Sequence, residues 1–132
     1  MQISQLFQVI KHITPDISEK ELRDLLPMLT ESKLKRGDHL VSAGNNFRQI
    51  NFIVKGAGRM YHVNSNGNET NILLVIENGF LHDYESLLLN KPTNFYIQAT
   101  DDCEIIHIDY LQFEQLLNST KNWERCGRMI NQ

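Results

Sequence analysis

The sequence predicts a mainly β domain: a jelly roll, or double-stranded β-helix, flanked by helices at both ends. Its 132 residues suit one compact domain. Six of its seven glycines lie between residues 34 and 108, a distribution typical of a chain that reverses direction about every ten residues. Apolar residues recur at helical spacing only before and after that stretch. We therefore expect one structural domain in three segments, with helices at 1–30, a β-roll with a short helix at 31–109, and helices at 110–132.

Two short helices are predicted in the first segment. The first carries apolar residues at helical spacing, and the Thr14-Pro15-Asp16 break ends it. Ser18 followed three residues later by Glu21 has the form of a capping box, which marks the start of the second helix. Leucines supply the apolar face of this second helix, namely Leu22, Leu25, Leu26 and Leu29.

The middle segment contains short apolar runs separated by turn residues. Many short strands at this spacing favour a sandwich or barrel, and a jelly roll has the right size. The Asn66-Gly67 pair between two such runs is the strongest hairpin signal in the chain. The predicted strands are His39–Ser42, Asn51–Lys55, Gly58–Asn64, Thr70–Ile76, Phe95–Ala99 and Cys103–Asp109.

Helical spacing returns in the last segment. Asp109, with Gln112 at the capping-box position, predicts a helix that carries four apolar residues up to Leu117. The run 118–120 then opens a last helix that has no stop signal before Gln132, so we expect this helix to continue in a longer protein. Its apolar stripe either awaits a partner helix in a dimer or packs onto the chain's own roll. The stripe consists of Trp123, Cys126, Met129 and Ile130.

The charge is distributed unevenly along the chain. The net charge of -3 combines a segment from Met60 to Thr120 with nine acids and one base, at -8, and a remainder with 12 bases and 7 acids, at +5. An acidic segment is a poor place to hold a phosphate or a nucleic-acid backbone, because both need Lys or Arg to offset their charge. The same pattern is also typical of a solvated acidic face.

The sequence also indicates the cellular compartment in which we expect the protein. No apolar run is long enough to span a bilayer, and the first residues lack the features of a signal peptide. We expect a soluble, cytoplasmic protein with no membrane partner. The two cysteines, Cys103 and Cys126, are too few for a disulfide framework, so we expect reduced thiols.

An enzyme with the same roll architecture, a metal-dependent cupin, is the catalytic alternative. Its metal motif needs a His-x-His pair, a nearby glutamate and a distant third histidine, and the five histidines here form no such pair. Only His62 with Glu69, or His107 with Asp109, offers part of a ligand set. No motif for nucleophilic catalysis is present either. We expect no catalytic and no metal-binding residues.

Four pieces of the roll segment, taken in order, resemble the sensor domain of the Crp/Fnr family of bacterial transcription regulators. They are Leu34-Lys35-Arg36-Gly37-Asp38, Gly44, Phe52-Ile53-Val54-Lys55-Gly56 and Asn66-Gly67-Asn68-Glu69. The resemblance extends from about Leu22 to Leu117 and implies the fold of a cyclic nucleotide-binding domain. It also implies that the last helix begins a long dimerisation helix, giving a homodimer. A DNA-binding domain, absent from this chain, would follow that helix.

The resemblance also implies a site. In the family, a phosphate-binding cassette uses a glutamate for the ribose, an arginine for the cyclic phosphate and the backbone N–H groups of a short helix. Here His82 and Asp83 fall at the places of the family's Gly-Glu pair, and Thr93 and Asn94 fall at the places of its Arg-Ser or Arg-Thr pair. The candidate ligand-binding residues are His82, Asp83, Tyr84, Glu85, Ser86, Lys91, Thr93 and Asn94.

The departures from that cassette decide the functional expectation. Threonine cannot replace the charged fork of arginine, and losing such a bond costs about 1.5–3 kcal/mol. No arginine lies between Arg59 and Arg125, and two acids sit in the cassette beside its only base, Lys91. We expect an effector-sensing domain, not an enzyme, that does not bind cyclic AMP in the usual way and whose ligand the sequence does not identify. A module that serves only for dimerisation or interaction, without ligand, is the alternative.

Overall fold

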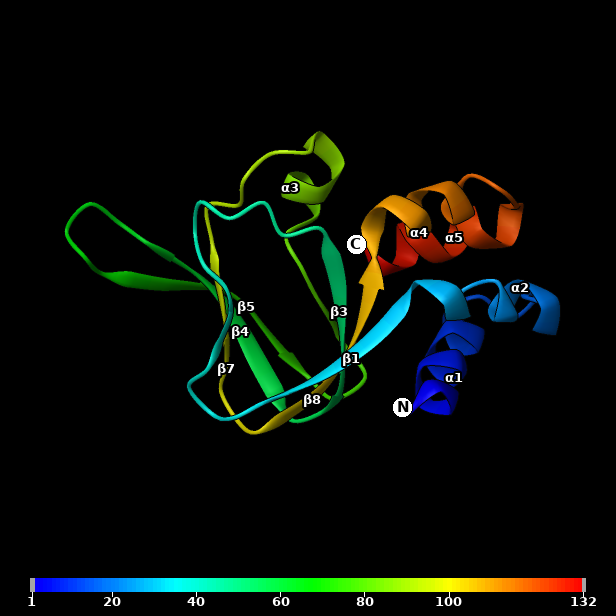
Figure 1. Cartoon of the computed structure of the whole chain (residues 1–132), viewed down its shortest axis with the longest axis horizontal. Helices are drawn as coiled ribbons and strands as arrows, with labels where there is room; N and C mark the ends of the chain where they lie inside the picture. Colours follow the sequence, from blue (N-terminus) through cyan, green and yellow to red (C-terminus); the bar gives the residue numbers. More distant parts are fainter. Residues whose placement is uncertain (1, 132) are drawn as a thin grey trace.

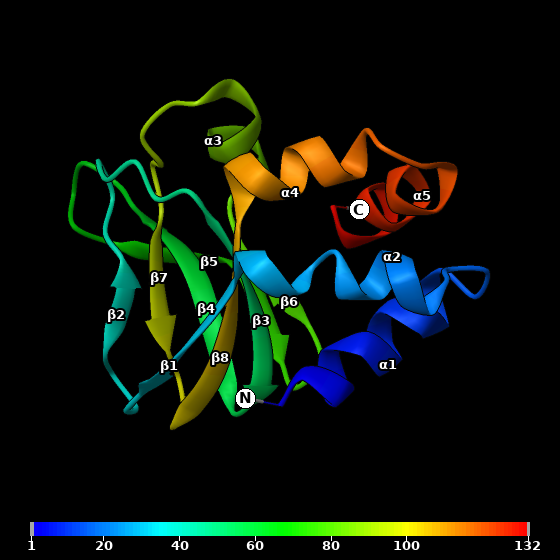
Figure 2. The ribbon, with the colours of Figure 1, turned by 45° about the vertical axis from the view of Figure 1, so that its right-hand side comes forward.

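The computed structural model describes residues 2–131 and places two antiparallel four-stranded sheets face to face (Figure 1). The strand order is β1-β8-β3-β6 in one sheet and β2-β7-β4-β5 in the other. The helices at the two ends of the chain gather beside the first sheet, as Figure 2 shows. The predicted fold class, a mainly β jelly roll with flanking helices, is confirmed.

Within residues 2–131, eight strands and five α-helices form these layers. The strands are β1 (Leu29–Leu34), β2 (His39–Val41), β3 (Gln49–Lys55), β4 (Ala57–Val63), β5 (Glu69–Ile76), β6 (Phe80–Leu81), β7 (Tyr96–Ala99) and β8 (Cys103–Asp109). The α-helices are α1 (Ile3–Ile13), α2 (Glu19–Arg23), α3 (Tyr84–Leu89), α4 (Tyr110–Leu117) and α5 (Lys121–Ile130).

Helix starts follow the predicted capping residues. Ser18 and Glu21 form the capping box of α2, each side chain accepting from the other residue's backbone N–H. Asp109 caps α4 by accepting from the backbone of Gln112, and Thr120 caps α5. Local side-chain chemistry therefore sets where three of the helices begin.

The end of the first helical segment differs from the prediction. Leu29 does not extend the apolar face of the second helix; it begins β1 and pairs with Ile108. The reason is Pro27, which lies in a 3-10 turn at Leu26–Met28 that ends the helical stretch. The strands β1 and β6 were not predicted, whereas the other six lie within two residues of their predicted bounds.

The hydrophobic core has two main parts. One lies between the two sheets, and the other lies between the helices and the face of β1-β8-β3-β6 that points away from the roll interior. Three members of the predicted stripe on α5 belong to this second part: Trp123, Cys126 and Ile130 are buried, whereas Met129 is 40% exposed. The stripe therefore packs onto the chain's own core, and only Met129 remains at the surface for a partner.

A buried chain of polar groups fastens four strands of the first sheet together. The Asn51 amide nitrogen donates to the Leu81 carbonyl at 2.9 Å, so its oxygen accepts from Nδ1 of His107 at 2.7 Å. Nε2 of His107 then accepts from the Ser32 hydroxyl at 2.7 Å. Burial lowers the pKa of His107, which fits a neutral ring with both nitrogens occupied.

The hairpin predicted at Asn66-Gly67 is present. It joins β4 to β5 and extends away from the roll (Figure 1, green). Gly67 has a φ of 83°, in the left-handed region that this turn requires. Among the described residues, none of the helices combines the length and apolar character needed to cross a bilayer.

Candidate functional site

The predicted cassette forms a compact unit around α3, which follows β6 at one end of the roll (Figure 1). Asp83 caps the helix, with its side chain accepting from the backbone N–H of Ser86 at 3.4 Å. Asn90 ends the helix with a φ of 50°, a left-handed conformation that asparagine tolerates better than most residues. The backbone of a short helix is therefore present where the resemblance implied it.

The residues at the family's glutamate and arginine places bond to each other. The Thr93 hydroxyl donates to the second oxygen of Asp83 at 2.7 Å. Thr93 is buried, and its backbone bonds to the loop after β2: its N–H donates to the Asn45 carbonyl at 3.0 Å and its carbonyl accepts from Gly44 at 2.8 Å. Both carboxylate oxygens of Asp83 thus have a donor from the cassette itself.

Little space remains between the cassette and the strands. The cavity there measures about 10 Å³, roughly what one water molecule needs. No Lys or Arg is among its lining residues, which are Val41, Phe47, Gln49, Asp83, Leu87, Thr93 and Ile97. A cyclic nucleotide would meet a filled, mostly apolar interior and no lining Lys or Arg to offset its phosphate.

Arg48 holds the cassette helix in place, and sequence reasoning missed it. Its guanidinium donates to the carbonyls of Ser86 and Leu87 at 2.9 and 2.8 Å. It also lies over the ring of Tyr110, 5.6 Å from the ring centre, at the start of α4. Arg48 therefore uses its charge inside the protein, on a helix end and an aromatic ring, and joins the cassette to the C-terminal helices.

The remaining polar residues of the cassette also bond locally. Ser86 is buried and donates to the carbonyl of Lys91 at 2.6 Å. Lys91 pairs with Glu85 at 2.8 Å, and this hydrogen bond and charge hold the pKa of the Glu85 carboxyl below its usual range. Tyr84 and Asn94 are exposed. Of the predicted ligand residues, the structure brings Asp83, Ser86 and Thr93 together, turns His82 toward the last helix, and leaves Tyr84, Glu85, Lys91 and Asn94 at the rim.

His82 connects the cassette to the end of the last helix. Its Nε2 lies 2.6 Å from Oδ1 of Asn131, and the Asn131 amide nitrogen donates to the Gly127 carbonyl at 2.9 Å. The amide oxygen must therefore accept, so His82 donates from Nε2. Its Nδ1 is buried without a hydrogen-bond partner, and burial lowers the pKa of His82 despite the opposing effects of Asn131 and Asp83.

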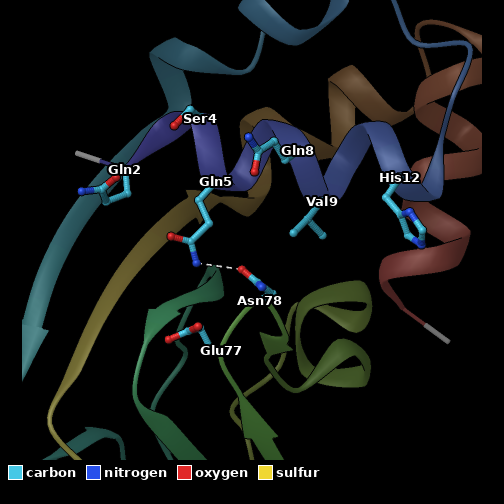
Figure 3. A pocket seen from close by; sticks show the side chains of 8 residues that line it. All are labelled: Gln2, Ser4, Gln5, Gln8, Val9, His12, Glu77 and Asn78. Carbon is cyan, nitrogen blue, oxygen red and sulfur yellow. Dashed lines mark hydrogen bonds between the residues drawn. The ribbon is translucent and has the colours of Figure 1, made fainter.

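A separate groove of about 730 Å³ lies between α1 and the turn after β5 (Figure 3). Gln5 spans it, donating from Nε2 to the Val54 carbonyl and to Oδ1 of Asn78, both at 2.7 Å. Gln2, Ser4, Gln8 and Val9 also line it, with His12 at one end and Glu77 beside Asn78. The groove therefore offers no lysine or arginine to an anionic ligand.

The side chains that could bind a metal ion do not come together among the described residues. Between residues 2 and 131, no three His, Cys, Asp or Glu side chains are grouped to hold an ion. His107, part of one incomplete cupin set, has both ring nitrogens occupied by Ser32 and Asn51. His62, from the other set, lies against the edge of the Phe95 ring.

Comparison with known proteins agrees with this geometry at the level of family and fold. The family of the cyclic nucleotide-binding domain matches residues 31–120. Among curated proteins, no sequence matches the chain.

Three solved structures illustrate the shared fold. A cyclic nucleotide-binding domain from Methylobacillus flagellatus has a TM-score of 0.80 at 17% identity, covering 98% of this chain and 74% of its own. The sensor domain of the transcriptional regulator DNR from Pseudomonas aeruginosa has a TM-score of 0.79 at 14% identity, covering 99% and 88%. The Thermus thermophilus catabolite activator protein has a TM-score of 0.75 at 14% identity. This chain, 93% of which is covered, spans 56% of that activator's length.

Proposed function

Because the chain belongs to the cyclic nucleotide-binding domain family, we propose that it is the effector-sensing domain of a Crp/Fnr-like transcription regulator. The shared fold of the DNR sensor domain and the catabolite activator protein supports this assignment. In the intact protein, an effector would shift the balance between two arrangements of the last helix and of a DNA-binding domain beyond it. This chain alone is not expected to bind DNA or to catalyse a reaction, and its place would be the cytoplasm.

We further propose that the roll interior does not take cyclic AMP or cyclic GMP in the usual way. The hydrogen bond between Thr93 and Asp83 carries this proposal, because it occupies the two positions that would hold ribose and phosphate. The cavity of about 10 Å³ supports it independently, because a nucleotide could enter only if the side chains around Leu87 moved.

Calorimetry with cyclic AMP and cyclic GMP tests this proposal. We expect no saturable heat at ligand concentrations up to the millimolar range, for the wild type and for Asp83→Ala alike. Tight binding of either nucleotide by the wild type, abolished in Asp83→Ala, would show that the cassette opens and works as in the family, and would overturn the proposal.

The filled interior also favours a second candidate function, a module for dimerisation or interaction that takes no ligand at all. The two functions differ in a measurable way. A sensor domain must change its conformation or its oligomeric state with some small molecule, whereas a ligandless module keeps both unchanged against every compound tested. Thermal shift across a metabolite panel, combined with sedimentation, separates them.

A homodimer is part of the proposal, but the dimer interface cannot contain the whole predicted stripe on α5. Trp123, Cys126 and Ile130 are buried in this chain, so Met129 is the member available to a partner. A larger apolar surface lies on β5, the outermost strand of its sheet, where Leu74 is 65% and Ile76 is 72% exposed. Exposed apolar residues grouped in this way are typical of an interaction surface. We propose that β5 and the Met129 side of α5 contribute the dimer contact.

A further inference from the structure

We propose that an effector site lies outside the roll, in the groove between the cassette helix and the last two helices, and that it takes a free amino acid. The proposal rests on the proposed sensor function. In that function the filled interior of the roll cannot hold the effector between the cassette and the strands, so the effector needs another site. The groove measures about 470 Å³ and combines residues of α3, α4 and α5. Figures 1 and 2 show α3 beside the start of α4, with α5 packed against α4.

The two charges in the groove point to a zwitterionic ligand. Glu124 and Arg128 are one helical turn apart on α5, and both line the groove. Opposite charges at this spacing commonly pair, yet within residues 2–131 neither side chain makes a hydrogen bond or an ion pair. One carboxylate and one guanidinium, one helical turn apart and without a side-chain partner in the described part of the chain, match the ammonium and carboxylate groups of an α-amino acid.

The remaining groove residues suit an amino acid better than a simple anion. Leu117 and the half-exposed ring of Tyr84 offer apolar surface to a ligand side chain. Asn118 offers an amide, whose nitrogen already donates to Glu114 at 3.1 Å and whose oxygen remains an acceptor. A phosphate or sulfate would gain Arg128 but would also meet the carboxylate of Glu124, which repels it.

The groove is connected to the cassette through one side chain. Asn131 lines the groove and accepts the hydrogen bond from Nε2 of His82, directly before the Asp83 cap. The other half of its amide is fixed on the Gly127 carbonyl. A ligand that turns this amide must therefore alter the hydrogen bond to His82. Binding in the groove then changes the surroundings of His82 at the start of α3.

Titration of the wild type with L-leucine and L-phenylalanine, followed by calorimetry, tests the site. We expect saturable binding of at least one of them. Leucine methyl ester lacks the carboxylate and N-acetyl-leucine lacks the ammonium, so each should bind at least tenfold more weakly. Arg128→Gln should weaken binding of the free amino acid by about tenfold or more, the ratio expected when one charge-assisted hydrogen bond is lost. Glu124→Gln should do the same.

Arg125→Gln is the matched control, because Arg125 is exposed on the same helix but does not line the groove. It should leave the affinity within about twofold. NMR of the histidine side chains adds a second readout, in which the bound amino acid should shift the His82 signals and leave those of His12, on α1, in place. No saturable binding at millimolar amino acid, equal losses in Arg125→Gln and Arg128→Gln, or an unmoved His82 would each overturn the proposal. The cyclic AMP titration above is read separately, so failure of the proposed function and failure of this site remain distinguishable.

Discussion

Thr93 and Asp83 stand at the two ligand positions of the cassette but bond to each other. An arginine and a glutamate at these places would each have a charge or a hydrogen-bonding group to offer a ligand. The shorter threonine and aspartate instead reach each other at 2.7 Å and satisfy each other. The sequence predicted which residues stand at the cassette, and only the structure showed that they are one another's partners.

Replacing Thr93 with valine keeps the shape of the side chain and removes its hydroxyl. We expect Thr93→Val to lower the free energy of unfolding by about 1–3 kcal/mol, because the half-buried Asp83 carboxylate loses its closer donor. Urea denaturation measures this change. Thr100→Val, at an exposed position, is the control and should stay within about 0.5 kcal/mol. Equal losses in both variants would contradict the role given to the Asp83–Thr93 bond.

Two buried histidines predict a pH dependence of stability. His82 and His107 have pKa values lowered by burial, so the unfolded chain takes up protons first as the pH falls. The contribution of these two histidines to the free energy of unfolding is fully present above about pH 6.5. Below that pH it should fall by up to about 1.4 kcal/mol per pH unit for each histidine, until the pH passes the lowered pKa of the folded state. Urea denaturation at pH 7.5 and 5.5 measures the effect.

His82→Gln serves as the variant for that pH series, since glutamine does not titrate. Its loss of stability between pH 7.5 and 5.5 should be smaller than that of the wild type. An unchanged pH dependence in the variant, or a flat one in the wild type, would show that His82 is not held neutral by its buried place beside Asn131.

Other residues of the site had no signal in the sequence. Arg48 lies about forty residues before the carbonyls that it binds on α3, and Asn131 lies 49 residues after His82. No local pattern of spacing connects such positions, because the contacts depend on how the strands and helices are brought together. The capping role of Asp109 was predictable, because its partner is three residues away.

At the scale of elements, Gly56 marks the tight junction between β3 and β4. Its φ is 97°, and a Cβ there would lie 2.2 Å from the backbone oxygen of Asp102. Gly56→Ala should therefore cost about 3 kcal/mol or more, because left-handed strain and a backbone overlap act together. Gly37→Ala is the matched control, since Gly37 has a φ of 92° but open space around it. It should cost about 1–2 kcal/mol, measured for both variants by urea denaturation. Equal costs would show that the backbone shifts to remove the overlap.

Six strands had a clear signal in the sequence and two did not, because the strands differ in composition and surroundings. The six predicted strands are apolar runs bounded by glycine or other turn residues, and β8 was predicted with its observed bounds. In contrast, β1 reads Leu-Thr-Glu-Ser-Lys-Leu and alternates little in hydrophobicity, because it is an edge strand that is mostly exposed. The two residues of β6 are too short to form a pattern. Pairing with β8 and β3 makes them strands.

At the scale of the whole molecule, the exposed surface of β5 predicts association. If the chain dimerises through this strand, Leu74→Lys should shift it to the monomer by placing a charge in an apolar contact. Sedimentation velocity at several protein concentrations measures the shift. Lys20→Gln, on the exposed side of α2, is the control and should not alter the oligomeric state. A dimer that survives Leu74→Lys would place the contact elsewhere.

The fit between Asp83 and Thr93 also bears on how such a domain could gain or lose nucleotide binding in evolution. Restoring an arginine at Thr93 alone would force a long side chain into about 10 Å³ of space. Enlarging that space first, for example at Leu87, would leave a void with no cation in it and would cost about 2–5 kcal/mol for a change to alanine. Each change alone therefore lowers the stability of the domain without providing a phosphate site. Nucleotide binding could therefore be introduced here only by two changes made together, the arginine and the space that it needs.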